Sequence, residues 1–221
     1  MRVEKLKDLV ARLHARPRRR LTLLVGVDGP AGSGKTTFTR ALAALDPGLD
    51  VIQLEDFGLA LAERAPPPGA PGAPGAPGAE PPAPDERVAA EIDWRRLRSS
   101  VLLPLSRDQP ARYQRYDPAT DAMAEWRMVP VGGIVIVEGR YACMKALTTF
   151  YDFRIWVDSP RDVRQVRLDR GNGTDPAHRL AGFGVEDAYV ASQDPAAAAH
   201  LRVDGSGAVA HDPAREYVRV R

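Results

Sequence analysis

Eight consecutive residues, 29–36, have the residue types and spacing that bind phosphate groups. They read Gly-Pro-Ala-Gly-Ser-Gly-Lys-Thr and match G-x-x-x-x-G-K-[ST] at every fixed position. Glycine lacks a Cβ, so the backbone can turn through positive φ and point successive N–H groups at phosphate oxygens. Lys35 adds a positive charge for the β- and γ-phosphates, and the Thr36 hydroxyl is placed to bind Mg²⁺. The residues predicted to bind ATP here are Gly29, Pro30, Ala31, Gly32, Ser33, Gly34, Lys35, Thr36 and Thr37.

Carboxylates that could serve the same site follow two other apolar segments. Glu55 and Asp56 come directly after residues 51–54, and Glu138 ends the apolar run 134–137. Parallel strands place their carboxyl ends at one edge of a sheet, so we expect these groups near the phosphate-binding loop. A carboxylate there can orient an acceptor hydroxyl and take its proton, or it can hold Mg²⁺, the role expected of Glu138. The alternative for the acidic pair is a surface turn.

The elements that must position these residues alternate between apolar runs and helical patterns. Residues 21–28 form a β-branched, apolar run, and a helix-compatible segment, 36–45, follows the glycine-rich loop. The run 134–137 is typical of a strand buried on both faces, as in a parallel sheet, and 153–158 reads as a further strand. Asp93 can cap a helix that ends near residue 104. The pattern predicts an α/β fold of the P-loop NTPase type, a parallel sheet flanked by helices with a small lid.

A row of arginines follows the predicted strand 153–158. Arg161, Arg164, Arg167 and Arg170 recur every three residues on a predicted helix, and residues 171–173 could form a hinge. Such a row can close over ATP phosphates and stabilise transition-state charge, which favours a lid. The alternative is a solvated face on which the arginines pair with nearby aspartates.

Residues 110–128 alternate arginine and tyrosine with short polar turns. Arg112, Arg115 and Tyr116, with Tyr113 between them, could line a pocket for an anionic or aromatic substrate. The alternative is a β-hairpin with exposed polar side chains, and the sequence does not separate the two.

Bulk composition excludes several classes of protein. Residues 1–20 carry eight Lys and Arg against two Asp and Glu, which leaves 23 against 27 in the rest, a net charge of −4. A mildly acidic body argues against nucleic acid as a partner.

The single cysteine, Cys143, excludes an intrachain disulfide and is expected to be a packed apolar residue. No apolar run is long enough for a membrane span, and we expect a cytoplasmic protein. The sequence does not decide whether the protein forms a homo-oligomer.

Two segments lie outside the predicted catalytic domain or interrupt it. Residues 1–20 are expected to form a basic N-terminal unit, with an amphipathic helix over 3–13 and a solvated arginine-rich connector over 16–20. Residues 21–221 then form the domain that contains the phosphate-binding loop. Within it, the stretch 65–84 holds nine of the twenty prolines and is expected to be a flexible insertion.

The ordered set of motifs resembles the uridine kinase group of P-loop kinases, which includes relatives such as pantothenate kinase and phosphoribulokinase. The resemblance spans most of residues 21–171 and rests on VDGPAGSGKTTF, LEDF, PARYQRYD, VIVEG and DFRIWVDSPRDVR. It implies transfer of the γ-phosphate of ATP, with Mg²⁺, to a nucleoside 5′-hydroxyl. Uridine or cytidine is then the expected acceptor in a pyrimidine-salvage reaction.

The resemblance also implies roles for individual residues. Lys35 would be catalytic, and Thr36, Glu138 and Asp56 would serve the metal. The catalytic carboxylate falls in LEDF, where we expect Asp56 to act, with Glu55 as the reserve. Further residues would contact ligands: Arg167 and Arg170 the nucleotide, and Tyr116, Arg112 and Arg115 the acceptor.

The sequence departs from the group around the acceptor. An Asp-His-Pro segment that helps bind ribose is missing where the insertion stands, and Asp121 occupies the place of a histidine. A kinase of pantothenate or of a sugar phosphate is therefore one alternative. A non-catalytic module in which ATP binding presents a partner surface is the other.

Overall fold

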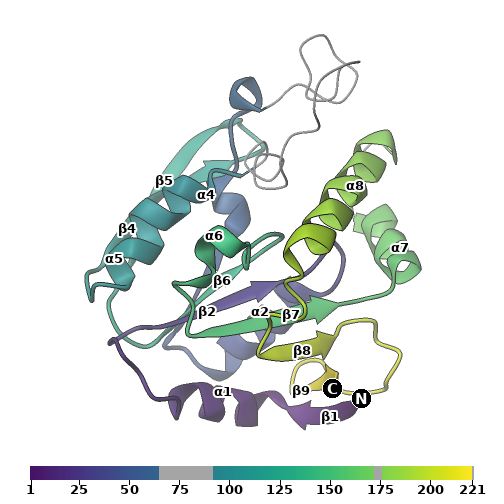
Figure 1. Ribbon diagram of the computed structural model, residues 1–221, viewed down its shortest axis with the longest axis horizontal. Coiled ribbons are helices and arrows are strands. Elements are labelled where there is room, and N and C mark those ends of the chain that lie inside the picture. Colours follow the sequence, from purple (N-terminus) through teal and green to yellow (C-terminus); the bar gives the residue numbers. More distant parts are fainter. Residues whose placement is uncertain (65–91, 172–175, 221) are drawn as a thin grey trace.

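The central element is a seven-stranded sheet in the order β1-β9-β8-β7-β2-β6-β3 (Figure 1). The computed structural model describes residues 1–64, 92–171 and 176–220. Five strands run parallel: β2 (Leu23–Asp28), β3 (Leu49–Gln53), β6 (Ile134–Glu138), β7 (Phe153–Asp158) and β8 (Leu201–Asp204). Strands β9 (Glu216–Val220) and β1 (Arg2–Lys5) extend one edge in antiparallel fashion. The mostly parallel α/β sheet confirms the predicted fold class.

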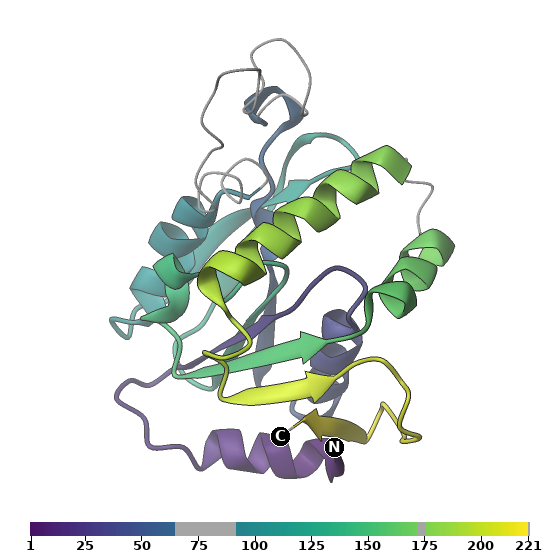
Figure 2. The ribbon, with the colours of Figure 1, turned by 45° about the vertical axis from the view of Figure 1, so that its right-hand side comes forward.

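Helices cover both faces of the sheet, and each face has its own apolar core. Helices α1 (Leu6–His14) and α2 (Lys35–Leu45) pack on the face that carries Val25, Ile136 and Ile155. The opposite face, with Leu24 and Val135, is covered by α6 (Lys145–Thr148) and α8 (Pro176–Gln193). Successive residues of a strand point to opposite faces of the sheet, so each buried strand contributes side chains to both cores. Helix α7 (Arg161–Gly171) lies beyond the end of β7 (Figure 2).

A separate two-stranded hairpin, β4 (Ala111–Asp117) and β5 (Ala122–Val129), packs beside the end of β3. The chain reaches it through two short 3₁₀ helices, η1 (Leu54–Phe57) and η2 (Leu61–Glu63). A helical segment then precedes the hairpin and consists of α4 (Trp94–Leu97), η3 (Arg98–Leu102) and α5 (Leu103–Leu105). Asp93 caps the N-terminus of α4, as predicted, because its carboxylate accepts a hydrogen bond from the Arg96 amide at 2.9 Å.

The N-terminal segment differs from its prediction. The helix begins at Leu6 instead of residue 3, because residues 2–5 form strand β1 and pair with β9. Residues 17–19 of the connector are exposed, as predicted, but two of its arginines also bond to the sheet domain. Arg20 forms an ion pair with Asp152 at 2.8 Å, and the Arg18 guanidinium donates to the Gly133 carbonyl at 3.2 Å. Both bonds hold the connector against the segments that lead into β6 and β7.

The remaining expectations have mixed outcomes. Helix α8 ends at Gln193, because Asp194 adopts a φ of 43° and a proline follows it. Cys143 is buried, and burial raises the pKa of its thiol well above the ordinary value. The insertion 65–84 and most of the hinge 171–173 lie outside the described residues. Among the described helices, none combines the length and apolarity that crossing a membrane requires.

Candidate active site

The phosphate-binding loop lies between β2 and α2, as the motif predicts. Its glycines adopt positive φ, 153° at Gly29, 74° at Gly32 and 101° at Gly34. The Lys35 ammonium donates to the carbonyls of Gly29 and Pro30 at 2.8 and 2.9 Å. Burial lowers the pKa of Lys35, while the carboxylates of Asp28 and Glu138 oppose that shift. A positive charge thus lies at the base of a loop of backbone amides.

Thr36 and Glu138 meet beside this loop. The Thr36 hydroxyl donates to Glu138 Oε1 at 3.0 Å, although 102 positions separate the two residues. The other carboxylate oxygen, Glu138 Oε2, is buried and has no hydrogen-bond partner among the described residues. Burial raises the pKa of Glu138, and the charge of Glu55 adds to the rise, whereas Lys35 and Thr36 lower it. A buried oxygen without a donor, next to a hydroxyl, fits the oxygen ligands that Mg²⁺ takes in phosphate sites.

The two adjacent acids after β3 point in different directions. Asp56 is buried, and its Oδ2 accepts a hydrogen bond from the Tyr113 hydroxyl at 2.9 Å. Arg127 lies 3.7 Å from the same oxygen. Burial raises the pKa of Asp56, and the neighbours that modify this shift all lie on the hairpin. Glu55 is exposed, and its charge acts on Glu138. The hairpin therefore holds the Asp56 carboxylate, and the role predicted for Asp56 toward the metal stays a prediction.

The arginine row on α7 reaches the phosphate loop through two of its members. Arg167 donates to the carbonyls of Gly32 and Ser206, both at 3.0 Å. Arg164 is buried, and its guanidinium contacts the Ala31 carbonyl at 3.4 Å. Arg161 points outward to Asp187, and Arg170 is exposed. The row is therefore split between loop contacts and solvent, as a helix with a repeat of three must be.

The predicted acceptor residues mostly follow the hairpin interpretation. The Arg112 guanidinium stacks 4.2 Å from the ring centroid of Trp126, and Arg115 pairs with Glu125 at 2.9 Å. Arg112 is exposed and Arg115 is partly exposed, so both mainly contact other residues of the hairpin, and their role toward an acceptor stays a prediction. Tyr116 is buried, and its hydroxyl donates to Asp121 at 2.7 Å. The aromatic residue that contacts a candidate catalytic acid is Tyr113, whose inward position follows from alternation along β4.

Sequence reasoning missed Asp28, a fully buried carboxylate at the end of β2. It accepts hydrogen bonds from the amides of Tyr141 and Cys143 at 3.0 and 2.9 Å and from the Tyr189 hydroxyl at 2.6 Å. It also accepts one from the Gly29 amide at 2.6 Å. Burial raises its pKa, and these bonds oppose the rise. Asp28 therefore ties the start of the phosphate loop to α8. A carboxylate within an otherwise apolar strand was the signal for such a role.

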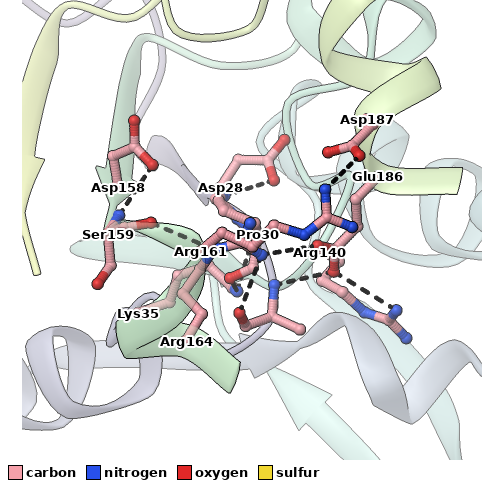
Figure 3. A network of polar contacts seen from close by, with 12 residues as sticks. Asp28, Pro30, Lys35, Arg140, Asp158, Ser159, Arg161, Arg164, Glu186 and Asp187 are labelled. Atoms are coloured by element: carbon pink, nitrogen blue, oxygen red, sulfur yellow. Dashed lines mark hydrogen bonds and ion pairs between the residues drawn. The ribbon is translucent and has the colours of Figure 1, made fainter. Parts of the chain in front are cut away.

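Glu186 on α8 was also missed, and it binds the phosphate loop directly. Its Oε1 accepts a hydrogen bond from the Ala31 amide at 2.9 Å, and its Oε2 pairs with Arg164 at 3.1 Å. Arg140 lies 3.7 Å from Oε1. Figure 3 shows this network around the loop, with Glu186 between arginines from different elements. Helix α8 is thus joined to the loop by the Ala31 hydrogen bond and to α7 by a buried ion pair.

We expect Glu186→Gln to destabilise the protein by about 3 kcal/mol, because it leaves the Arg164 charge buried without its counter-ion. Chemical denaturation measures the loss. Asp187→Asn is the matched control, since the pair of Asp187 with Arg161 is exposed and should contribute about 0.5 kcal/mol or less. Equal losses in the two variants would contradict a structural role for the buried pair.

Solved structures of three kinases share this fold. One is a possible uridine kinase from Bacillus stearothermophilus, with a TM-score of 0.65 and 20% identity over 89% of this chain and 96% of that one. A candidate fructose transport system kinase from Silicibacter sp. TM1040 has a TM-score of 0.58 and 22% identity over 89% and 95%. The D-glycerate 3-kinase from Cryptococcus neoformans has 0.52 and 15% over 83% and 85%.

Comparisons of the sequence gave no further relative. No family model matches the chain. No curated protein matches it either. At these identities the likeness concerns the fold. The chain therefore has the α/β fold found in solved structures of uridine kinase-like and related P-loop kinases.

Proposed function

We propose that the protein is a kinase that transfers the γ-phosphate of ATP to a hydroxyl of a small acceptor, with a nucleoside such as uridine or cytidine as the first candidate. The observation that supports this most is the Thr36–Glu138 pair beside the loop of Lys35, with a buried Glu138 oxygen left for a cation. ATP and Mg²⁺ are the implied ligands. When bound between Thr36 and Glu138, Mg²⁺ would neutralise charge on the phosphate oxygens.

In the proposed mechanism, the chain supplies positioning and charge. The amides of residues 29–36 and the Lys35 ammonium hold the phosphates and stabilise the charge that spreads over the transferred group. Arg167, already bonded to the loop, adds a second cation at its rim. We assign the acceptor proton to Glu55, because this carboxylate is exposed and within electrostatic reach of Glu138. Asp56 then acts as a positioning residue that holds the hairpin.

A second candidate acceptor is an anionic metabolite, such as a sugar phosphate or pantothenate. The supporting observation is Arg127, which is opposite Tyr113 in the hairpin register and whose side chain is 47% exposed near Asp56. A half-exposed guanidinium on this wall would favour a phosphate or carboxylate on the acceptor. Because a candidate fructose transport system kinase and a D-glycerate 3-kinase have a similar fold, fructose and D-glycerate are included among the acceptors to be tested.

The test is ADP release with Mg·ATP against a panel of acceptors: uridine, cytidine, pantothenate, fructose, D-glycerate and sugar phosphates. We expect a nucleoside to raise the rate well above the basal hydrolysis of ATP. Turnover with an anionic acceptor alone would replace the nucleoside proposal with the second candidate. Tight ATP binding without turnover on any acceptor would favour the non-catalytic module.

A further inference from the structure

A cavity of about 200 Å³ lies at the end of the sheet opposite the phosphate loop. It is lined by basic and aromatic side chains, with leucines between them: Arg12, Arg16, Phe153, His200 and Arg219. Phe153 is the first residue of β7, whereas the phosphate loop follows the last residue of the neighbouring β2. Helix α1, which carries Arg12, runs beneath β8 in both ribbon views (Figures 1 and 2). The cavity is therefore separate from the candidate active site.

Stacked rings and a guanidinium fix one wall of the cavity. The Arg16 guanidinium lies 4.7 Å from the ring centroid of Phe153, and the Phe153 and His200 rings stack at 5.2 Å with an angle of 16°. His200 Nδ1 accepts a hydrogen bond from the Arg154 amide at 2.9 Å. The neutral ring therefore carries its proton on Nε2, which is a donor. Burial, together with Arg154 and Arg16, lowers the pKa of His200 and favours this neutral form.

The charge around the cavity is unbalanced. Glu4 is the carboxylate that meets the lining arginines, at 3.0 Å from Arg12 and 3.4 Å from Arg219. The guanidinium of Arg16 donates to a neutral group, the Asp152 carbonyl, at 3.3 Å. The Asp152 carboxylate itself is bonded to Arg20 and to the Leu24 amide. Three positive charges thus face one negative charge, and the lining side chains offer donors rather than acceptors.

We propose that this cavity binds a phosphate dianion, either free or as the monoester of a small metabolite. Guanidinium groups match the oxygens of phosphate and bind them more strongly than neutral donors do. A dianion would also balance the two excess charges. The size favours a small ligand, because the volume equals only about six to seven water molecules at roughly 30 Å³ each.

The test follows the ring nitrogen signals of His200 by NMR, with the phosphate loop saturated by Mg·ADP. Inorganic phosphate and glycerol 3-phosphate are titrated in turn, against sodium chloride at equal ionic strength. We expect a saturable shift of the His200 signal with at least one of the two phosphates, and tighter binding of the ester would identify a metabolite site. Arg16→Gln should weaken the binding about tenfold, because one charge-assisted bond is lost. Arg215→Gln, which removes an exposed charge outside the cavity, should leave it unchanged.

Two results would overturn the proposal. One is a His200 response no larger with either phosphate than with chloride. The other is an unchanged affinity in Arg16→Gln, whose folding is verified by its thermal midpoint. If that variant does not fold, Arg219→Gln takes its place with the same expectation. The readout is local to His200, so the outcome does not depend on whether the protein is an active kinase.

Discussion

Replacing Lys35 by methionine should reduce phosphoryl transfer by about 10²- to 10³-fold, the effect of losing one preorganised group that stabilises transition-state charge. The fold should persist. The variant loses two hydrogen bonds to loop carbonyls, but it also removes a charge whose burial already lowers its pKa. These effects oppose each other, so we expect the free energy of unfolding to change by no more than about 2 kcal/mol.

The measurement pairs ADP release at saturating acceptor with chemical denaturation of the same preparation. Lys145→Met is the control, because the Lys145 ammonium is exposed and donates to the Ser192 carbonyl of α8, not to the phosphate loop. That variant should keep the wild-type rate. A Lys35→Met protein that transfers phosphate at a near wild-type rate would remove the loop from the mechanism.

The second large effect concerns the two acids after β3. Glu55→Gln should lower kcat by about 10²- to 10⁴-fold, the range for loss of a general base, while ATP affinity stays close to that of the wild type. Asp56→Asn should lower kcat by less than about tenfold, because an amide oxygen can still accept the Tyr113 hydrogen bond. Its effect should fall on stability and on the KM of the acceptor through the hairpin.

Steady-state kinetics of the two isosteric variants decide the assignment. A large kcat loss in Asp56→Asn with a mild one in Glu55→Gln would return the catalytic role to Asp56, as the sequence suggested. Tyr113→Phe provides an additional check. It removes the contact that holds Asp56 but leaves Glu55 unchanged, so it should resemble Asp56→Asn and not Glu55→Gln.

Local patterns predicted the parts of the site that neighbouring residues build. The positive φ values of Gly29, Gly32 and Gly34 follow from the motif, and the position of Glu138 follows from a buried strand that ends in an acid. The parallel sheet, in turn, determines that such strand ends meet at one edge. This is why the Thr36–Glu138 contact could be expected across 102 positions.

The rest of the site depends on contacts that no local pattern encodes. Glu186 reaches the Ala31 amide across 155 positions, from a helix whose sequence shows no feature of a phosphate site. The sequence equally did not show which of Glu55 and Asp56 is buried. Adjacent residues in a tight turn point in different directions, and only the position of Tyr113 on the hairpin decides which one is buried. These contacts between distant residues are determined only when the helices, the sheet and the hairpin pack together.

The pairing of β1 with β9 brings the first and last segments of the chain together at one edge of the sheet. During synthesis on the ribosome, β1 therefore cannot pair until β9, more than 200 residues later, has emerged. The leucines of α1 share their core with α2, which is made soon after them, but also with Leu201, Val203 and Tyr217, so this core is completed late. Truncation that removes β9 should therefore destabilise β1 and the packing of α1 as well.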